Sequence, residues 1–149
     1  MKLNHFTDFS MRVLMYLNQK KDSPQSSLDD LANAFKISRN HLVKVVQFLA
    51  ANQLVLTKRG KNGGISISET AKQIPLGDLI HLLEQDDSPI VNCDAKPCIF
   101  KSHNCKLKSL FNKAYLLFIE SLNESNLADL EFNDWNSIFE NNPNAQNNS

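Results

Sequence analysis

The sequence predicts a mainly α-helical protein that contains one small β-hairpin. Apolar residues recur at helical spacing in most segments of the 149-residue chain. Two short runs, 54–57 and 65–68, have the composition of strands, and the loop between them holds three of the four glycines. No apolar run approaches the length of a membrane span, so we expect a folded protein without membrane segments.

The first predicted helix runs from Asp8 to about Leu17. Thr7 stands where an N-cap is needed, and apolar residues follow it at helical spacing. A polar connector, residues 20–26, contains Pro24 and ends the helix. Asp8 falls in the first turn, where the helix dipole favours a carboxylate. By sequence chemistry alone, Asp8 is therefore a partner of the dipole.

The next two predicted helices are short and close together in the sequence. Ser27 and Asp30 form a capping-box pattern before an apolar stripe that ends at Phe35, and Ser38 caps the following helix. Two such helices predict a helix-turn-helix, whose second helix reads bases in the major groove. Its exposed polar side chains can bond base edges, although an ordinary solvated helix face is the alternative. The DNA contacts predicted here are Ser38, Arg39, Asn40, His41, Lys44 and Gln47.

The loop between the two predicted strands adds a basic tip. Asn62-Gly63 is a strong hairpin signal, and the nearby cations can lie along phosphates or enter a minor groove. A glycine-rich phosphate loop would open a helix, whereas here a strand follows. A helix-turn-helix with a basic wing is a winged helix. The DNA contacts predicted in the wing are Arg59, Gly60, Lys61 and Asn62.

The formal net charge of zero hides an uneven distribution of charge. Residues 31–68 contain six basic residues and no acidic one, whereas residues 116–149 contain six acidic residues and no basic one. A basic module of this kind is typical of nucleic-acid binding. Since the chain offers no nucleophile–base pair, phosphate loop or second cofactor motif, we expect a DNA-binding regulator and not an enzyme.

A long amphipathic helix predicts a dimer. Pro75 begins a helix that ends near Glu84, and a longer one runs from after Cys105 to about Leu122. The apolar side of the longer helix is too wide for a small domain to cover, so we expect it to pack against a second subunit. In such a homodimer, two recognition helices about 34 Å apart would read a palindromic operator in double-stranded DNA.

All three cysteines, Cys93, Cys98 and Cys105, fall in one polar loop. Thiolates suit a soft metal or an iron-sulfur cluster, but a tetrahedral zinc site or a cubane cluster needs a fourth ligand. The spacing matches neither a zinc knuckle nor a ferredoxin, so three reduced thiols without metal are an open alternative. The odd number of cysteines and the lack of a signal peptide predict a cytoplasmic protein.

The chain divides into four predicted parts. A winged helix-turn-helix DNA-binding domain occupies residues 1–84, and a loop for cluster binding follows over 85–105. The long C-terminal dimerisation helix lies within 106–130. The acidic, Asn-rich tail, 131–149, is predicted to be disordered.

Four motifs together are similar to one known family. They are Phe6-Thr7-Asp8, residues 38–44, residues 59–64, and Val91-Asn92-Cys93 with two further cysteines. Over about residues 1–130 the chain resembles the NsrR/IscR family of winged-helix iron-sulfur regulators, and within it the nitric-oxide-sensing branch.

The resemblance implies a homodimer with one iron-sulfur cluster per subunit, either 4Fe–4S or 2Fe–2S. Its ligands would be Cys93, Cys98, Cys105 and Asp8 of the partner subunit. The resemblance also implies a repressor. Nitric oxide would nitrosylate the cluster, the link that the cluster makes between the two subunits would be lost, and the operator would be released. Genes of the nitric oxide stress response are then derepressed.

Several alternatives stay open. His103 lies inside the loop and could replace Asp8 as the fourth ligand. The second candidate function is an IscR-like, iron-sulfur or redox-responsive regulator of another regulon, although that branch places a histidine just after the third cysteine and none follows Cys105. An electron carrier or metalloenzyme, and a winged-helix repressor with structural zinc, are the remaining alternatives.

Overall fold

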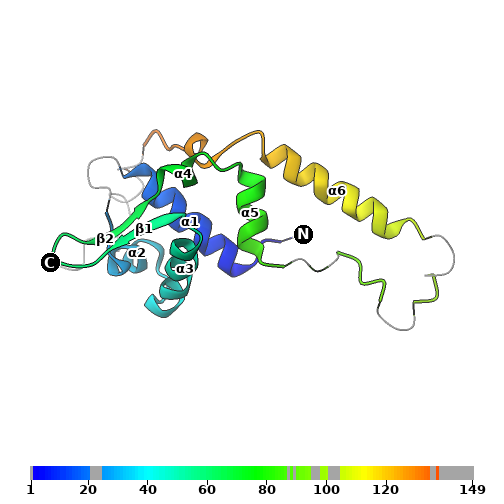
Figure 1. The fold of residues 1–149 in the computed structure, drawn as a ribbon, viewed down its shortest axis with the longest axis horizontal. Helices are drawn as coiled ribbons and strands as arrows, with labels where there is room; N and C mark the ends of the chain where they lie inside the picture. Colours follow the sequence, from blue (N-terminus) through cyan, green and yellow to red (C-terminus); the bar gives the residue numbers. More distant parts are fainter. Residues whose placement is uncertain are drawn as a thin grey trace. The chain divides into compact units, whose positions relative to one another are not determined.

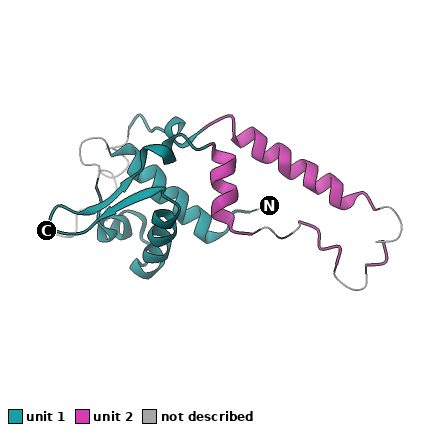
Figure 2. Ribbon diagram, viewed as in Figure 1, with its two compact units in different colours: residues 1–74, 126–149 teal, residues 75–125 magenta. Residues whose placement is uncertain are grey.

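The computed structural model shows a mainly helical chain with one antiparallel, two-stranded hairpin, as the sequence predicts (Figure 1). The structure describes residues 2–20, 25–86, 88, 90–94, 98–100, 105–134 and 137. The chain forms two compact units, residues 1–74 with 126–149, and residues 75–125 (Figure 2). The four parts predicted from the sequence were defined by their expected roles, and that division stays a prediction. Most of the tail predicted to be disordered lies outside the described residues.

In the first unit, helix α1 spans His5–Gln19 and begins earlier than predicted. Its N-cap is Asn4, whose side-chain oxygen accepts a hydrogen bond from the backbone N–H of Thr7 at 2.8 Å. The prediction that Thr7 caps this helix is wrong, because Thr7 lies inside α1 and is fully buried. Asn caps a helix at least as well as Thr, and the earlier start lets Phe6 pack edge-on against Phe48, with 5.2 Å between ring centroids.

Helices α2, Leu28–Phe35, and α3, Arg39–Ala51, form the predicted helix-turn-helix. Both hydrogen bonds of the capping box between Ser27 and Asp30 are present, at 2.8 and 3.1 Å. Ser38 is the N-cap of α3, as predicted. These boundaries could be read from the sequence because each is fixed by a side chain next to the helix that it caps.

The core of the first unit is built from the apolar side chains of the three helices and the wing. The buried stripe predicted for α3 is confirmed, so the opposite side of α3 lies at the surface. The buried apolar residues of the three helices and the wing are Val13, Leu14, Leu17, Leu31, Leu42, Val45, Val46, Leu49, Leu54, Val55 and Ile65, and Ile37, Ala71 and Leu127 from other segments of the unit complete the core.

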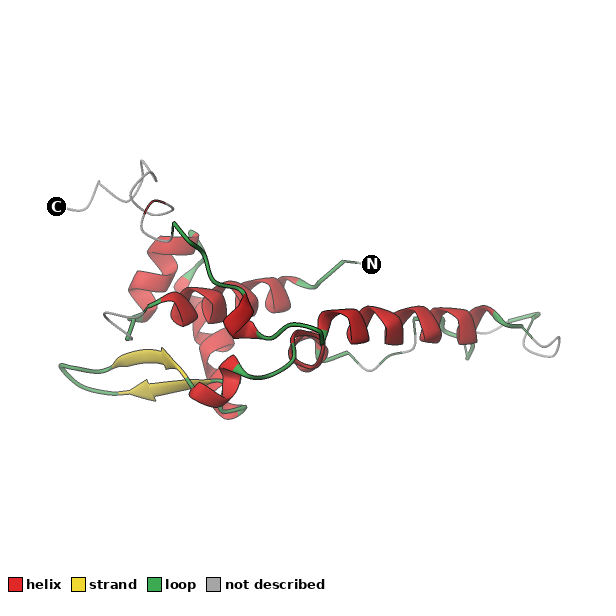
Figure 3. Ribbon diagram, turned by 90° about the horizontal axis from the view of Figure 1, so that it is seen from above, coloured by secondary structure: helices red, strands yellow, loops and turns green. Residues whose placement is uncertain are grey.

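The wing is a hairpin of β1, Val55–Lys58, and β2, Gly64–Ile67. The pairing runs from Val55 opposite Ile67 to Lys58 opposite Gly64, one residue away from the predicted strand limits. Ser26 adds a bridge to β2, with backbone hydrogen bonds of 2.9 and 2.8 Å to Ile65. In Figure 3 the two strands and their loop extend beyond the helices of this unit, so the loop is open to a ligand.

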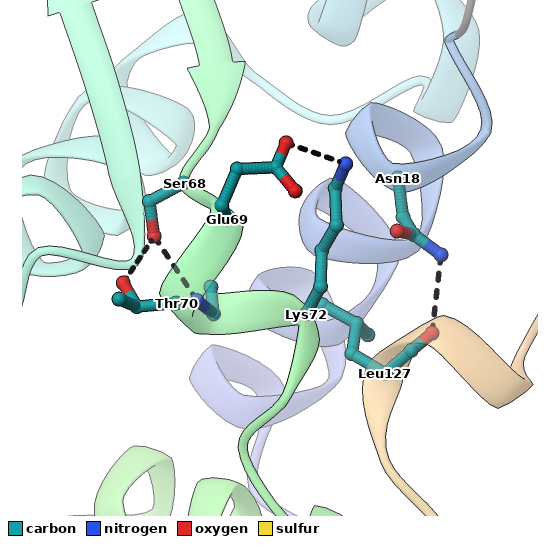
Figure 4. A network of polar contacts seen from close by, with 7 residues as sticks. Asn18, Ser68, Glu69, Thr70, Lys72 and Leu127 are labelled. Atoms are coloured by element: carbon teal, nitrogen blue, oxygen red, sulfur yellow. Dashed lines mark hydrogen bonds and ion pairs between the residues drawn. The ribbon is translucent and has the colours of Figure 1, made fainter.

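Two short elements complete the first unit, and neither was predicted as a helix. In α4, Glu69–Lys72, the hydroxyl of Ser68 accepts from the backbone N–H of Ala71 at 3.1 Å and donates to the carbonyl of Gln53 at 2.7 Å. The 3-10 helix η1, Leu127–Asp129, inserts the fully buried Leu127. The side chain of Asn18 donates to the Leu127 carbonyl at 3.1 Å (Figure 4). The chain after residue 125 therefore finishes the core that α1 begins.

The second unit contains α5, Leu76–Glu84, and α6, Leu107–Leu122 (Figure 2). The side chain of Asn123 accepts from the backbone N–H of Asp78 and donates to its carboxylate, both at 3.0 Å. A Cβ on Gly77 would collide with the carbonyl oxygen of Ile119 and lie 2.5 Å from Oδ1 of Asn123. Glycine is thus required where the start of α5 meets the end of α6.

Helix α6 has no buried residue. Five of its large apolar side chains, at positions 107, 110, 111, 116 and 117, are between 44% and 62% exposed. The apolar surface predicted to mediate dimerisation is therefore present on this chain. Among the described residues, no helix has both the length and the apolar character needed to cross a membrane.

Candidate functional site

The predicted DNA contacts of the helix-turn-helix lie on the exposed side of α3 and in its N-cap. Ser38, Arg39, Asn40, His41, Lys44 and Gln47 are all exposed. The buried stripe on the opposite side fixes the helix to the core and leaves these six side chains open to solvent. Their contact with DNA remains a prediction.

Three of these residues already have partners within the chain. The Nε atom of Arg39 lies 3.0 Å from the carboxylate of Asp29 on α2, and both side chains are more than half exposed. The hydroxyl of Ser38 lies 3.0 Å from Nδ1 of His41. The ion pair orients the guanidinium at the start of α3, and because exposed pairs are weak, a phosphate or a base can replace the carboxylate.

The wing places its cations at an exposed tip. Lys58, Arg59 and Lys61 are exposed, and no carboxylate among the described residues is paired with them. The backbone N–H of Gly63 donates to the carbonyl of Gly60 at 2.9 Å, which closes the turn. Gly60 has a φ of +105°, a conformation that glycine adopts without strain. The tip can therefore present cations to a phosphate backbone.

Asp8 lies half-buried in the first turns of α1. Its two carboxylate oxygens each accept a hydrogen bond from Nε of Arg12 at 3.1 Å, and a second guanidinium nitrogen lies 3.0 Å from Oδ2. Asp8 is thus paired with a cation in addition to standing in the first turn. To bind iron, this carboxylate would have to leave Arg12.

The three cysteines are free thiols in the second unit. Cys93 and Cys98 are half-exposed and Cys105 is exposed. Among the described residues, no three His, Cys, Asp or Glu side chains are gathered as a metal site. Residues 95–97 and 101–104, which include the alternative ligand His103, lie outside the described part of the chain. The donor set still fits a soft metal or a cluster, since three accessible thiols follow one another in a single loop.

An acidic residue marks the start of the cysteine loop. Hydrogen bonds from the side chain and the backbone of Ser88 lower the pKa of Asp86. The backbone N–H of Ser88 donates to Oδ1 of Asp86 at 2.9 Å. Asp86 therefore stays anionic where the chain leaves α5.

Two residues of the site were missed from the sequence. Arg12 holds Asp8, and Asp29 holds Arg39. The spacing of Asp8 and Arg12 is the i, i+4 spacing of helical ion pairs, so this partner could have been found. Asp29 and Arg39 sit on different helices, and only the fold brings them together.

Comparison with known proteins decides the family. Residues 3–132 match the Rrf2 family, described as iron-dependent transcriptional regulators. The chain belongs to the Rrf2 family. A curated relative, the HTH-type transcriptional regulator NsrR of Oceanobacillus iheyensis, is 38% identical over 133 residues, which cover 87% of this chain and 89% of that protein.

Solved structures of similar proteins have the same fold. The oxidised form of CymR from Staphylococcus aureus has a TM-score of 0.68 at 23% identity and covers 90% of this chain and 99% of its own. CymR, the global cysteine regulator of B. subtilis, has a TM-score of 0.66 at 25% identity, with coverages of 87% and 95%. IscR of T. potens has a TM-score of 0.67 at 22% identity, with coverages of 87% and 85%.

These relatives confirm the predicted fold and resemblance. As a member of the Rrf2 family, the chain is a transcriptional regulator with a DNA-binding winged helix. Its relatives are regulators, which also confirms the prediction that this Rrf2 protein is not an enzyme.

Proposed function

We propose that this Rrf2 regulator is a homodimeric repressor whose iron-sulfur cluster senses nitric oxide and whose nitrosylation releases the operator. The observation that carries the proposal is the donor set: Cys93, Cys98 and Cys105 as accessible thiols in one loop. The 38% identity to an NsrR supports assigning that loop to a cluster sensor. The proposed dimer holds one cluster, 4Fe–4S or 2Fe–2S, in each subunit.

Asp8 of the partner subunit is the proposed fourth ligand. A carboxylate is a harder donor than a thiolate, so it is the ligand most easily lost from iron. When bound, the cluster supplies the iron with which nitric oxide reacts. The Asp8 carboxylate then returns to Arg12, which in the free chain lies within 3.1 Å of it. This exchange would break the link between two subunits while leaving each of them folded.

The second copy is proposed to pack on α6. The exposed apolar side chains of this helix form a surface that favours association in water. Pairing of two copies would give two recognition helices related by a two-fold axis. A palindromic operator in double-stranded DNA matches that symmetry, with half-sites about 34 Å apart.

Contacts to DNA are proposed from the start of α3 and from the wing. Arg39, Asn40, His41, Lys44 and Gln47, together with Ser38, would bond base edges and nearby phosphates. Arg59, Gly60, Lys61 and Asn62 would follow the backbone or enter the minor groove. All ten positions are exposed.

The test is purification without oxygen, followed by native mass spectrometry and absorbance during stepwise addition of nitric oxide. Operator binding is measured in parallel, on a DNA site selected from a random pool by the cluster-loaded protein. We expect a cluster-bearing dimer that gains nitrosyls and loses DNA affinity. A colourless zinc dimer would refute the cluster. A cluster indifferent to nitric oxide would favour the IscR-like regulator, and redox cycling without salt-sensitive DNA binding would favour an electron carrier.

A further inference from the structure

A pocket lies between the start of α1 and the start of α3 in the first unit. Its volume is about 360 Å³, and its lining residues are His5, Phe6, Phe9, His41, Lys44 and Val45. The ring centroids of His5 and Phe9 are 6.1 Å apart, and those of Phe9 and His41 are 6.3 Å apart. Rings at these spacings form a wall that suits another aromatic ring.

Asp8 directly precedes Phe9, which lines the pocket. His5, Asp8 and Phe9 have the i, i+3, i+4 spacing that places side chains on one side of a helix. With a rise of about 1.5 Å per residue, these three side chains leave α1 within roughly 6 Å of one another along the axis. A chain segment held at Asp8 would therefore also reach the pocket.

The cysteine loop carries an exposed aromatic side chain, Phe100, of the kind that suits such a pocket. Ile99 and Phe100 follow Cys98 directly and are 69% and 60% exposed. Two residues of extended chain span at most about 7 Å. A group that binds the Cys98 thiolate therefore also keeps the Phe100 ring close to that group.

We propose that the pocket binds Phe100 of a second copy of this chain. The inference rests on the proposed function, in which Asp8 binds the cluster of the partner subunit and so brings the partner's Cys98 to α1. The partner's Phe100 would then pack against Phe9 and His41.

The bound ring would connect the cluster to the recognition helix. His41 and Lys44 line the pocket and are also predicted DNA contacts. The Ser38 hydroxyl lies 3.0 Å from Nδ1 of His41, so Nε2 is the nitrogen left for DNA. When the link at Asp8 breaks, the partner's Phe100 withdraws and the first turns of α3 lose a supporting contact. Nitrosylation would thus act on the position of α3 as well as on the spacing of the two subunits.

The first experiment is photo-crosslinking between labelled subunits. Unlabelled protein with 4-benzoylphenylalanine at position 9 is exchanged with ¹⁵N-labelled native protein, loaded with cluster without oxygen, and irradiated. We expect a crosslink from the α1 peptide to the labelled tryptic peptide 73–101, which contains Phe100. The same group at Leu56, which is 60% exposed on β1, is the control and should not give this product. Crosslinks confined to one chain would overturn the proposal.

The second experiment is a double-mutant cycle on operator binding by the cluster-loaded dimer. Phe100→Ala and Phe9→Ala should each weaken operator binding by about tenfold, which is the scale of a lost aromatic contact. The double variant should bind the operator only slightly more weakly than either single variant. In cluster-free protein the Phe100→Ala effect should vanish. Ile90→Ala, which truncates another exposed apolar residue before the first cysteine, is the matched control.

The two proposals fail in distinguishable ways. A protein without a cluster would refute the proposed function and this inference with it. A cluster-bearing dimer that responds to nitric oxide, but in which the effects of Phe9→Ala and Phe100→Ala are additive, would refute only the binding of Phe100.

Discussion

The wing cations should set much of the salt dependence of DNA binding. Lys61 and Arg59 lie at the exposed tip of the hairpin, and no carboxylate of the described residues neutralises them. Each is therefore free to displace a counterion from a phosphate. The perturbation is Lys61→Ala, with Arg59→Ala as a second variant at the same tip.

The expected change in salt dependence is set by the number of wings in the dimer. Each phosphate contact adds about 0.9 to the slope of log K against log salt concentration. In a two-fold symmetric dimer one substitution removes two contacts, so the slope should fall by about 1.8. If binding in 1 M salt is unchanged, the loss of affinity at 0.1 M salt is about 60-fold.

The assay is fluorescence anisotropy of a labelled operator at several salt concentrations. Lys113→Ala is the matched control, because Lys113 is also an exposed cation and lies on α6, outside the winged helix. Its slope should equal that of the native protein. An unchanged slope in both wing variants would mean that the wing does not touch the backbone of DNA.

Three further predictions concern the cluster, the second unit and the recognition helix. Cys93→Ala should abolish cluster binding and the nitric oxide response while circular dichroism stays native, and a retained coloured cluster would remove Cys93 from the ligand set. Gly77→Ala should lower the free energy of unfolding by about 1–3 kcal/mol, since its methyl group would collide with the Ile119 carbonyl, and unchanged thermal unfolding would refute this close approach. Asp29→Ala should strengthen operator binding by freeing Arg39, whereas weaker binding would show that the pair positions Arg39 for DNA.

Local signals made much of the fold predictable. The capping box at Ser27 and Asp30 and the cap at Ser38 each act within one helical turn, so helices α2 and α3 begin where expected. The wing hairpin was found for the same reason, because its glycine-rich turn determines the pairing over a few residues. The start of α1 was predicted wrongly because Asn4 and Thr7 are both acceptable N-caps. A packing contact of Phe6 favours Asn4, the earlier of the two.

Long-range contacts were not predictable from local pattern. Asn18 and Gln19 are polar residues beyond the predicted helix end, yet both are buried and donate to the carbonyls of Leu127 and Leu130. More than a hundred residues separate the two sides of these bonds. The candidate cluster site was predictable only as a set of donors, since the three cysteines share one loop. In the proposed function its geometry would depend on the bound group and on a second subunit, neither of which is encoded in local spacing.

The two ion pairs of the site hold Asp8 and Arg39 in position when neither iron nor DNA is bound. Asp8 is proposed to bind iron and Arg39 to bind DNA, and each is paired with an opposite charge of its own chain. All four side chains are at least 41% exposed, and pairs of this kind stabilise a protein by only about 0–1 kcal/mol. Exchanging Arg12 for iron, or Asp29 for a phosphate, therefore costs little, while the pairs hold each binding group near its place. In the proposed switch, Arg12 would give Asp8 a partner within its own chain once the bond to iron is lost.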